Sequence, residues 1–322
     1  MKLIKNFPAI FILLLWIILM PVDVKAQAQQ NSHLYTDFKP FKTVFLPDTH
    51  ISFKENDDWI LRKESFVIFQ DAVKSLKTVP GLDFVVFGGD LTDNDDNALS
   101  DLPMFLDSIE DVNFKYYAIL GDRDADLKEG YTKQDFCAEF RRNGFENPEL
   151  TYWTDQPVPN VLLIGLDTSQ ENKFEGKLSP EELLWLDDTL KSNPDKFTVI
   201  AMHHQILESE FLNIINKYPQ VKLILSGHRH NYAVSNLNGK LFISLPSVVT
   251  YPNLFKILTV YPDRVEIENQ DISFKQIIKK SKNIITKTKY AEEFDAKNPK
   301  NVLKFLRGDE FNNKKVFYYQ GK

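Results

Sequence analysis

Five of the six histidines in this chain stand at the ends of apolar runs that are typical of buried β-strands. These five are His50, His203, His204, His228 and His230. His228 and His230 are two residues apart, and on an extended segment side chains with this spacing point to the same side. Gly227 before them lets the backbone turn without a Cβ clash. Both imidazoles can therefore face one site beyond the strand end.

Carboxylates stand at the ends of further apolar runs, and together with histidines they give seven candidate metal ligands. The seven are Asp48, His50, Asp90, Asp122, His203, His228 and His230. Mixed imidazole and carboxylate ligation suits Mn, Fe or Zn better than Mg or Ca. One ion takes about four to six donors, so seven are too many for one ion. Because one carboxylate can bridge two ions, the sequence predicts two divalent or trivalent transition-metal ions.

Strand and helix patterns alternate along the chain, which predicts an α/β domain. The expected strands are 41–47, 83–87, 116–120, 161–166, 197–202, 221–225, 241–245, 255–261 and 264–268. The expected helices are 58–79, 98–109, 132–142, 208–217 and one that begins after the N-cap Ser179. In open α/β sheets the carboxyl ends of the strands face the ligand crevice, so the seven ligands should converge there. The acidic run 93–96 is expected to be a solvated loop, with orientation of a ligand histidine by Asp93 as the alternative.

The overall composition and the first 28 residues restrict what the protein can be. The net charge of -6 does not suggest a protein that binds duplex nucleic acid. Lys2 and Lys5 precede the apolar run 9–20, and Ala26-Gln27-Ala28 follows, which is typical of a secretory signal peptide. A membrane anchor is the alternative, but twelve apolar residues are short of the roughly 20 that a spanning helix needs. We therefore expect a periplasmic or secreted protein without an integral membrane segment after cleavage, and the oligomeric state stays open.

Residues 271–322 differ in charge from the rest of the chain. They hold 13 Lys and Arg against 6 Asp and Glu. Such asymmetry indicates either an extension that contacts an anionic surface or a basic helical extension folded onto an acidic body. We favour the second interpretation because the segment has apolar faces to bury. The expected organisation is thus a signal peptide at 1–28, a catalytic domain at 29–270 and a basic, mostly helical extension at 271–322.

A single cysteine, Cys137, leaves no possibility of an intrachain disulfide or of a C-x-x-C motif. Stability must then come from the hydrophobic core. Cys137 lies in a helical pattern, and we interpret it as a small buried apolar residue.

Five ordered motifs resemble those of the calcineurin-like metallophosphoesterases, whose superfamily includes purple acid phosphatases and class III cyclic-nucleotide phosphodiesterases. The motifs are Asp48-x-His50, Gly89-Asp90-x-x-Asp93, Gly121-Asp122-Arg123-Asp124, His203 and Gly227-His228-x-His230. The resemblance covers about residues 41–270. It implies a four-layer sandwich of two mixed β-sheets flanked by helices, with the metal site at the carboxyl ends of the strands.

The resemblance also implies a role for each ligand. Asp48, His50 and His230 would bind one ion, and Asp122, His203 and His228 the other, with Asp90 bridging the two. The implied activity is that of an exported phosphoesterase, which hydrolyses a phosphodiester or phosphomonoester by attack of metal-activated hydroxide. The implied partner is a small phosphoester substrate, whose identity the sequence leaves open.

The third motif departs from the family, which usually has Gly-Asn-His where this chain has Gly121-Asp122-Arg123. Arg123 can hold phosphate oxygens but cannot give up a proton at working pH. His204 is the alternative proton donor, and packing or support of a ligand is its other interpretation. The altered motif also leaves open a second function, namely a metal-binding but catalytically weakened protein that binds phosphate ligands.

Overall fold

The computed structural model describes residues 37–308 and 314–320, apart from residues 57, 94–97, 125–130, 148 and 172. Of residues 98–100 and 293 it describes the backbone alone. The predicted signal peptide at 1–28 lies outside the described residues.

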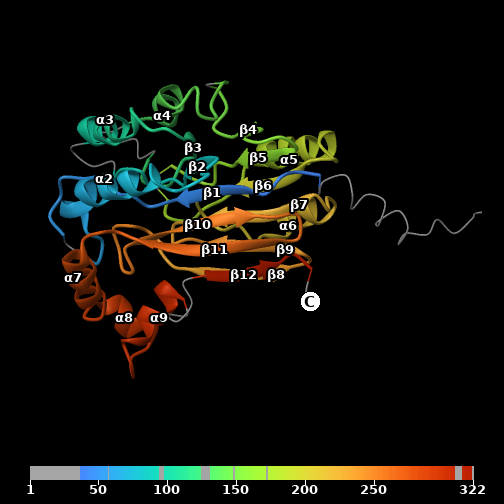
Figure 1. Cartoon of the computed structure of the whole chain (residues 1–322). Coiled ribbons are helices and arrows are strands. Elements are labelled where there is room, and N and C mark those ends of the chain that lie inside the picture. The colour runs from blue at the N-terminus through green and yellow to red at the C-terminus, as the bar shows by residue number, and fades with distance from the viewer. Residues whose placement is uncertain are drawn as a thin grey trace, which may run out of the picture.

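The first of two β-sheets has six strands in the order β12-β11-β10-β1-β2-β3 (Figure 1). In chain order the strands are β1 (Phe41–Leu46), β2 (Phe84–Phe87), β3 (Lys115–Ala118), β10 (Leu254–Val260), β11 (Arg264–Asp271) and β12 (Lys314–Tyr318). β1, β2 and β3 are parallel, whereas β10, β11 and β12 pair in antiparallel fashion. The sheet is therefore mixed, and its parallel half ends on one side.

The second sheet also has six strands, in the order β4-β5-β6-β7-β9-β8. They are β4 (Trp153–Asp155), β5 (Val161–Gly165), β6 (Phe197–Ala201), β7 (Val221–Ser226), β8 (Ala233–Leu237) and β9 (Lys240–Ser244). β5, β6, β7 and β9 are parallel, and the two edge strands are antiparallel.

Helices cover the outer faces of both sheets. α2 (Ser65–Leu76) and α3 (Ala98–Ile109) pack on the first sheet, where the rings of Phe69 and Phe105 contact that of Phe87. α5 (Pro180–Ser192) and α6 (Ser209–Asn216) cover the second sheet and share a buried apolar cluster with β5, β6 and β7. The four-layer sandwich of two mixed sheets flanked by helices is confirmed. The short α4 (Lys133–Glu139) buries Cys137, as expected.

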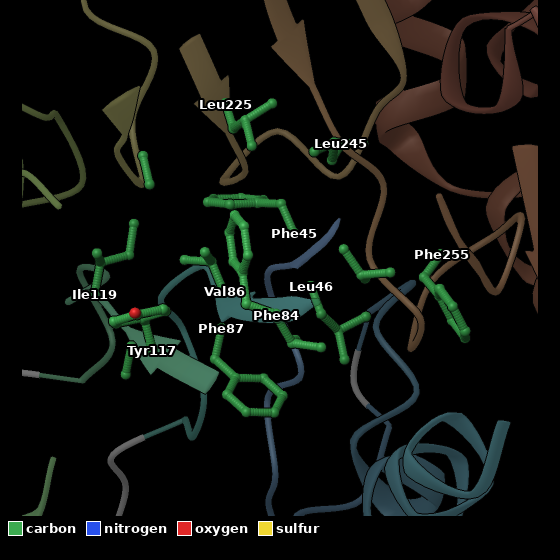
Figure 2. Packing of buried hydrophobic residues seen from close by; sticks show 14 of the residues in the cluster. Phe45, Leu46, Phe84, Val86, Phe87, Tyr117, Ile119, Leu225, Leu245 and Phe255 are labelled. Carbon is green, nitrogen blue, oxygen red and sulfur yellow. The ribbon is translucent and has the colours of Figure 1, made fainter. Parts of the chain in front are cut away.

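The main core fills the space between the two sheets and the space between the first sheet and the helices α2 and α3. Figure 2 shows Phe45 and Phe84 of the first sheet on the side that faces Leu225 of the second, while Phe87 lies on the opposite side. Burying a Phe or Leu side chain stabilises a fold by ~1.5–3 kcal/mol, so these alternating strand residues fix both faces of the first sheet.

Two features of the fold differ from the sequence prediction. The helix expected at 58–79 begins only at Ser65, after a 3₁₀ turn at Arg62–Glu64, because Arg62 turns inward to bond Asp58 and Asp93. The edge strands β4, β8 and β12 were not predicted. Edge strands are short and partly solvated, so they lack the continuous apolar run that marks a buried strand.

The C-terminal extension consists of α7 (Lys275–Ile285), α8 (Lys289–Phe294), α9 (Asn301–Arg307) and the edge strand β12. Figure 1 shows the three helices together at the end of the sheets toward which β1 runs. Lys280 pairs with Glu64, and Lys314 pairs with Glu266 and Glu268, so basic groups of the extension meet acidic groups of the body. None of the described helices has the length and apolar character needed to cross a membrane.

Candidate metal centre

All seven predicted ligands follow the carboxyl ends of parallel strands, and the structure brings them together. They lie after β1, β2, β3, β6 and β7, so both sheets contribute. Five of them have positive φ angles, which L-residues rarely adopt: Asp48, His50, Asp90, His228 and His230. Each such conformation costs ~1–3 kcal/mol and clusters at functional sites. The fold thus holds these side chains against local backbone preference.

Two glycines allow the loops after β2 and β3 to touch. A Cβ at Gly121 would clash with the backbone nitrogen of Asp90, and one at Gly89 would lie 2.6 Å from the nitrogen of Gly121. Buried Asp124 links the same loops by accepting hydrogen bonds from Leu91 N (2.8 Å) and Gly121 N (2.9 Å). Burial, together with the charge of Asp90, raises the pKa of Asp124 to about 7. Asp124, the fourth residue of the third motif, therefore holds the loops that carry Asp90 and Asp122 in place.

Asp48, His50 and His230 form what we call the closed half-site. All three side chains are buried. The Nε2 atoms of His50 and His230 lie 3.1 Å apart, and Nε2 of His230 lies 3.4 Å from Oδ1 of Asp48. Burial works against the charge of Asp48, but the neighbouring His230 and His203 outweigh it and lower the pKa of the carboxyl. Three potential ligand atoms thus face one point.

Asp93 and Arg62 support the closed half-site from behind. Nδ1 of His50 donates to Oδ1 of Asp93 (2.7 Å), which turns Nε2 toward the cluster, and Arg62 bonds the other oxygen of Asp93. Burial opposes protonation of His50, but the hydrogen bond and charge of Asp93 outweigh it and raise the pKa of His50 to about 9. The expectation of a solvated loop is therefore wrong for Asp93, which is buried and orients a ligand histidine. Residues 94–97 lie outside the described residues.

Aromatic rings cover the same half-site. The ring of Trp59 lies 5.2 Å from that of His230, and Tyr290 of α8 stacks on Trp59 at 5.4 Å with an interplanar angle of 8°. The C-terminal extension therefore forms part of the wall of the metal centre. No sequence pattern predicts this contact, because Trp59 and Tyr290 lie 231 positions apart.

Asp122, His203 and His228 form the open half-site. Oδ1 of Asp122 lies 3.1 Å from Nδ1 of His228 and 3.3 Å from Nε2 of His203. Nδ1 of His203 donates to the carbonyl of Gly88 (2.8 Å), so its Nε2 faces the cluster. Burial works against ionisation of Asp122, but hydrogen bonds from His203 and the neighbouring histidines lower the pKa of its carboxyl strongly.

Asp90 lies between the two half-sites. Its Oδ2 is 3.8 Å from Nε2 of His50 in the closed half-site and 3.5 Å from Nε2 of His203 in the open one. Its Oδ1 accepts a hydrogen bond from the backbone nitrogen of Arg123 (2.8 Å). Asp90 thus faces both sets of ligands, and Asp48 of the closed half-site also approaches the open one, with Oδ1 3.8 Å from Nε2 of His203.

His204 and Arg123, the two predicted catalytic residues, lie at the edge of the open half-site. Nε2 of His204 donates to the carbonyl of Phe174 (3.1 Å), and its Nδ1 lies 3.0 Å from the Thr168 hydroxyl. Burial lowers the pKa of His204, although a hydrogen bond to Asp122 opposes the shift, so the ring is neutral near pH 7. The side chain of Arg123 is 47% exposed, and its Nε lies 3.7 Å from Asp122.

The donor set fits bound metal ions. Nε2 of His203 is buried and makes no hydrogen bond of normal geometry, although carboxylate oxygens of Asp90 and Asp122 lie within 3.5 Å. In the closed half-site, two imidazole nitrogens face each other, and two lone pairs at this distance repel unless a proton or a cation lies between them. Burial opposes a charge on His203, yet the surrounding carboxylates raise its pKa well above its usual value. The cluster therefore attracts positive charge, and its ligand types suit transition metals.

The profile of the calcineurin-like phosphoesterase family matches residues 41–232, which is more than half of the chain. The chain belongs to the calcineurin-like phosphoesterase family. This membership assigns it to the metal-dependent phosphoric ester hydrolases, which use divalent metal ions. The resemblance inferred from the five motifs is confirmed.

Two bacterial relatives are named as phosphodiesterases. The chain is 29% identical over 192 residues to a probable glycerophosphodiester phosphodiesterase of Arcobacter nitrofigilis, which covers 54% of this chain and 66% of that protein. It is 23% identical over 269 residues to the 3',5'-cyclic adenosine monophosphate phosphodiesterase of Haemophilus influenzae, which covers 74% of this chain and 89% of that one. Such relatives imply a small phosphoester as substrate.

Two solved structures share the fold. A dimetal phosphatase from Danio rerio aligns with a TM-score of 0.61 at 15% identity, over 72% of this chain and 97% of that one. A purple acid phosphatase from yellow lupin aligns with a TM-score of 0.52 at 15% identity, over 74% of this chain and 53% of that one. At this identity both support the sandwich architecture alone.

Proposed function

We propose that this protein hydrolyses a small phosphodiester or phosphomonoester at a centre of two transition-metal ions. The observation that carries the proposal is the position of Asp90. One oxygen of its carboxylate faces both half-sites. The closed half-site has one further carboxylate and two histidines, and the open half-site has Asp122 with His203 and His228, beside which His204 also lies. A shared carboxylate between two such sets is the arrangement that a two-ion site needs.

Bound ions would supply Lewis acidity toward a phosphoryl oxygen and lower the pKa of a bound water. The residues of the chain supply the geometry. Asp48, His50 and His230 would hold one ion, and Asp122, His203 and His228 the other. Asp93 and the carbonyl of Gly88 keep the Nδ1 protons of His50 and His203 in place, so each Nε2 presents its lone pair.

Arg123 would bind the phosphoryl group. Its backbone nitrogen fixes Asp90, while its exposed guanidinium stands beside the open half-site and can hold two phosphate oxygens at once. It cannot give a proton to the leaving group. His204 is poorly placed to do so, because its Nε2 proton faces two acceptors, the Phe174 carbonyl (3.1 Å) and Oδ1 of Asp122 (3.3 Å). We therefore propose that substrates whose leaving groups need no protonation react fastest, and that His204 positions the Phe174 loop.

Metal analysis combined with a panel of phosphoesters tests the proposal. The wild-type protein should carry about two ions per chain and hydrolyse an aryl phosphodiester. Asp90→Ala should lose both the ions and at least roughly 1,000-fold of the turnover, because the carboxylate proposed to be shared by the two ions is then absent. Asp107→Ala removes an exposed carboxylate of α3 and should change neither. Full activity in a metal-free Asp90→Ala protein would refute the proposal.

A protein that binds phosphate ligands with weakened catalysis is the second candidate. The observation that favours it is Asp122, which places a charged carboxylate against the histidines where the family has a neutral amide. An added negative charge makes bound ions weaker Lewis acids. Metal occupancy without turnover, followed by activity in the double variant Asp122→Asn and Arg123→His, would support this candidate over the first.

We also propose that the protein is exported to the periplasm or secreted. The support is the order of basic, apolar and small residues at 1–28, which is typical of a signal peptide. Sequencing the N-terminus of the mature protein tests this, because cleavage should leave Gln29 or a close neighbour first. An uncleaved protein that stays with the membrane would support an anchor instead.

A further inference from the structure

We propose that Phe174 is a stacking platform that selects phosphoesters carrying a flat aromatic group, such as an aryl ring or a nucleobase. This inference rests on the proposed function, since it names the class of substrate that the metal centre would accept. Phe174 lies in the loop between β5 and α5, and its ring contacts that of His228 with centroids 4.4 Å apart.

Phe174 is exposed to solvent beside the metal centre. Of the phenylalanines that the structure describes, it is the most exposed, at 63%. Burying a phenyl ring stabilises a fold by ~1.5–3 kcal/mol, so a ring left in water gives up that stabilisation. The neighbours of Phe174 in the loop 169–177 are polar or glycine, so no apolar cluster within the loop explains the ring. Phe174 differs from an ordinary exposed ring in its place beside the metal centre, where a bound substrate can reach it.

Several contacts hold the backbone of the Phe174 loop in place. The carbonyl of Phe174 accepts a hydrogen bond from His204 (3.1 Å), and the amide of Lys177 donates to the carbonyl of Thr168 (2.9 Å). Gly176 packs so closely on His204 that a Cβ there would clash with the imidazole. The side chain of Gln170 donates to the carbonyl of Glu175 across the loop (2.8 Å). The loop is therefore tied to the floor of the metal centre, and a platform held in this way loses little entropy when a ligand stacks on it.

The position of the Phe174 ring indicates which part of a substrate would stack on it. His228 belongs to the open half-site, and Arg123, which would hold the phosphoryl group, lies at the same half-site. An aromatic group attached to that phosphoryl group would lie over the exposed face of Phe174. Aromatic pairs gain ~0.5–1.5 kcal/mol beyond the area that they bury, which a polyol such as glycerol cannot gain. The contact therefore discriminates between the two chemical classes.

Binding of two matched phosphonates to the manganese-loaded protein tests the platform. Phenylphosphonate and cyclohexylphosphonate have the same head group and similar size, but only the first is flat and aromatic. Their C–P bond resists a phosphoester hydrolase, so calorimetry measures binding without turnover. The wild type should bind phenylphosphonate about fivefold more tightly than cyclohexylphosphonate. Phe174→Ala should abolish this preference, whereas Phe174→Trp should keep it.

The controls separate stacking from damage to the centre. Metal content should be equal in all variants, and Phe294→Ala, which removes a partly exposed ring from α8, should keep the wild-type preference. No preference in the wild type, no measurable binding of either phosphonate, or a preference that survives Phe174→Ala would overturn the inference. A clear preference in a protein that hydrolyses no phosphoester would instead refute the proposed function and leave the platform standing.

Discussion

The two half-sites use the same ligand types, but their surroundings differ. In the closed half-site all three ligands are buried, and Asp93, Arg62 and the Trp59–Tyr290 stack support them from behind. In the open half-site His228 is 13% exposed and borders the exposed side chains of Arg123 and Phe174. The closed side is built to fix a ligand geometry, whereas the open side is built to meet a substrate.

The two half-sites also differ in how closely their residues match the motifs of the family. The closed half-site matches the family motifs at every ligand position, and the side chains of Asp93 and Arg62 that support its ligands are buried. The altered third motif and the polar loop around Phe174 both lie at the open half-site. Substrate choice and catalytic strength can therefore vary there without disturbing the other ion.

The largest expected contrast is between His50 of the closed half-site and His204 beside the open one, in the pH dependence of stability of the metal-free protein. The pKa of His50 is raised from 6.5 to about 9, so its contribution is complete below pH 6.5 and is lost as the pH rises to 9. The stability advantage of the wild type over His50→Gln should therefore fall by up to about 3 kcal/mol over this interval. Urea unfolding in the presence of a chelator measures it.

His204 at the open half-site should show the opposite sign. Its pKa is lowered, so the folded state resists a proton that the unfolded chain accepts. The wild type should therefore gain stability relative to His204→Gln as the pH rises toward 6.5. If both variants showed the same sign, the opposite pKa shifts assigned to His50 and His204 would be wrong.

A smaller contrast concerns metal affinity. Asp93→Asn removes the charge that orients His50 and should weaken the binding of one ion roughly 10- to 100-fold, while the second ion stays in place. Thr168→Val removes the hydroxyl that contacts His204 and should leave both affinities unchanged. Competition with a chelator, followed by metal analysis, resolves the two ions. Equal loss of both ions in Asp93→Asn would contradict the independence of the half-sites.

The smallest expected effect comes from the C-terminal extension. Tyr290→Ala removes the ring that stacks on Trp59 and should lower the free energy of unfolding by at least ~1 kcal/mol, whereas Tyr290→Phe should keep it. The relative affinity for the two phosphonates should not change, because Phe174 lies at the other half-site. If Tyr290→Ala changed the preference for phenylphosphonate, the Trp59–Tyr290 stack and Phe174 would not act independently.

The sequence predicted the buried strands well, because each is a continuous apolar run that ends in a polar motif. It predicted the helix at 58–79 less well, since Arg62 is compatible with a helix until its distant partner Asp93 is known. It missed β12 because Lys314–Tyr318 is a short segment that follows helical patterns, and its Val316, Phe317 and Tyr318 become a strand only through pairing with β11. Phe174 offered a weak signal, namely one phenylalanine in a polar loop.

Residue types and order by themselves determined the α/β class, the family and the seven candidate ligands, because metal ligation requires specific side chains at strand ends. Only the tertiary structure decided which groups support those ligands. Trp59, Asp93, His204 and Tyr290 gain their places from contacts across tens to hundreds of residues. The local sequence specifies which chemical group each residue offers. The packing of the two sheets specifies which other residue that group contacts.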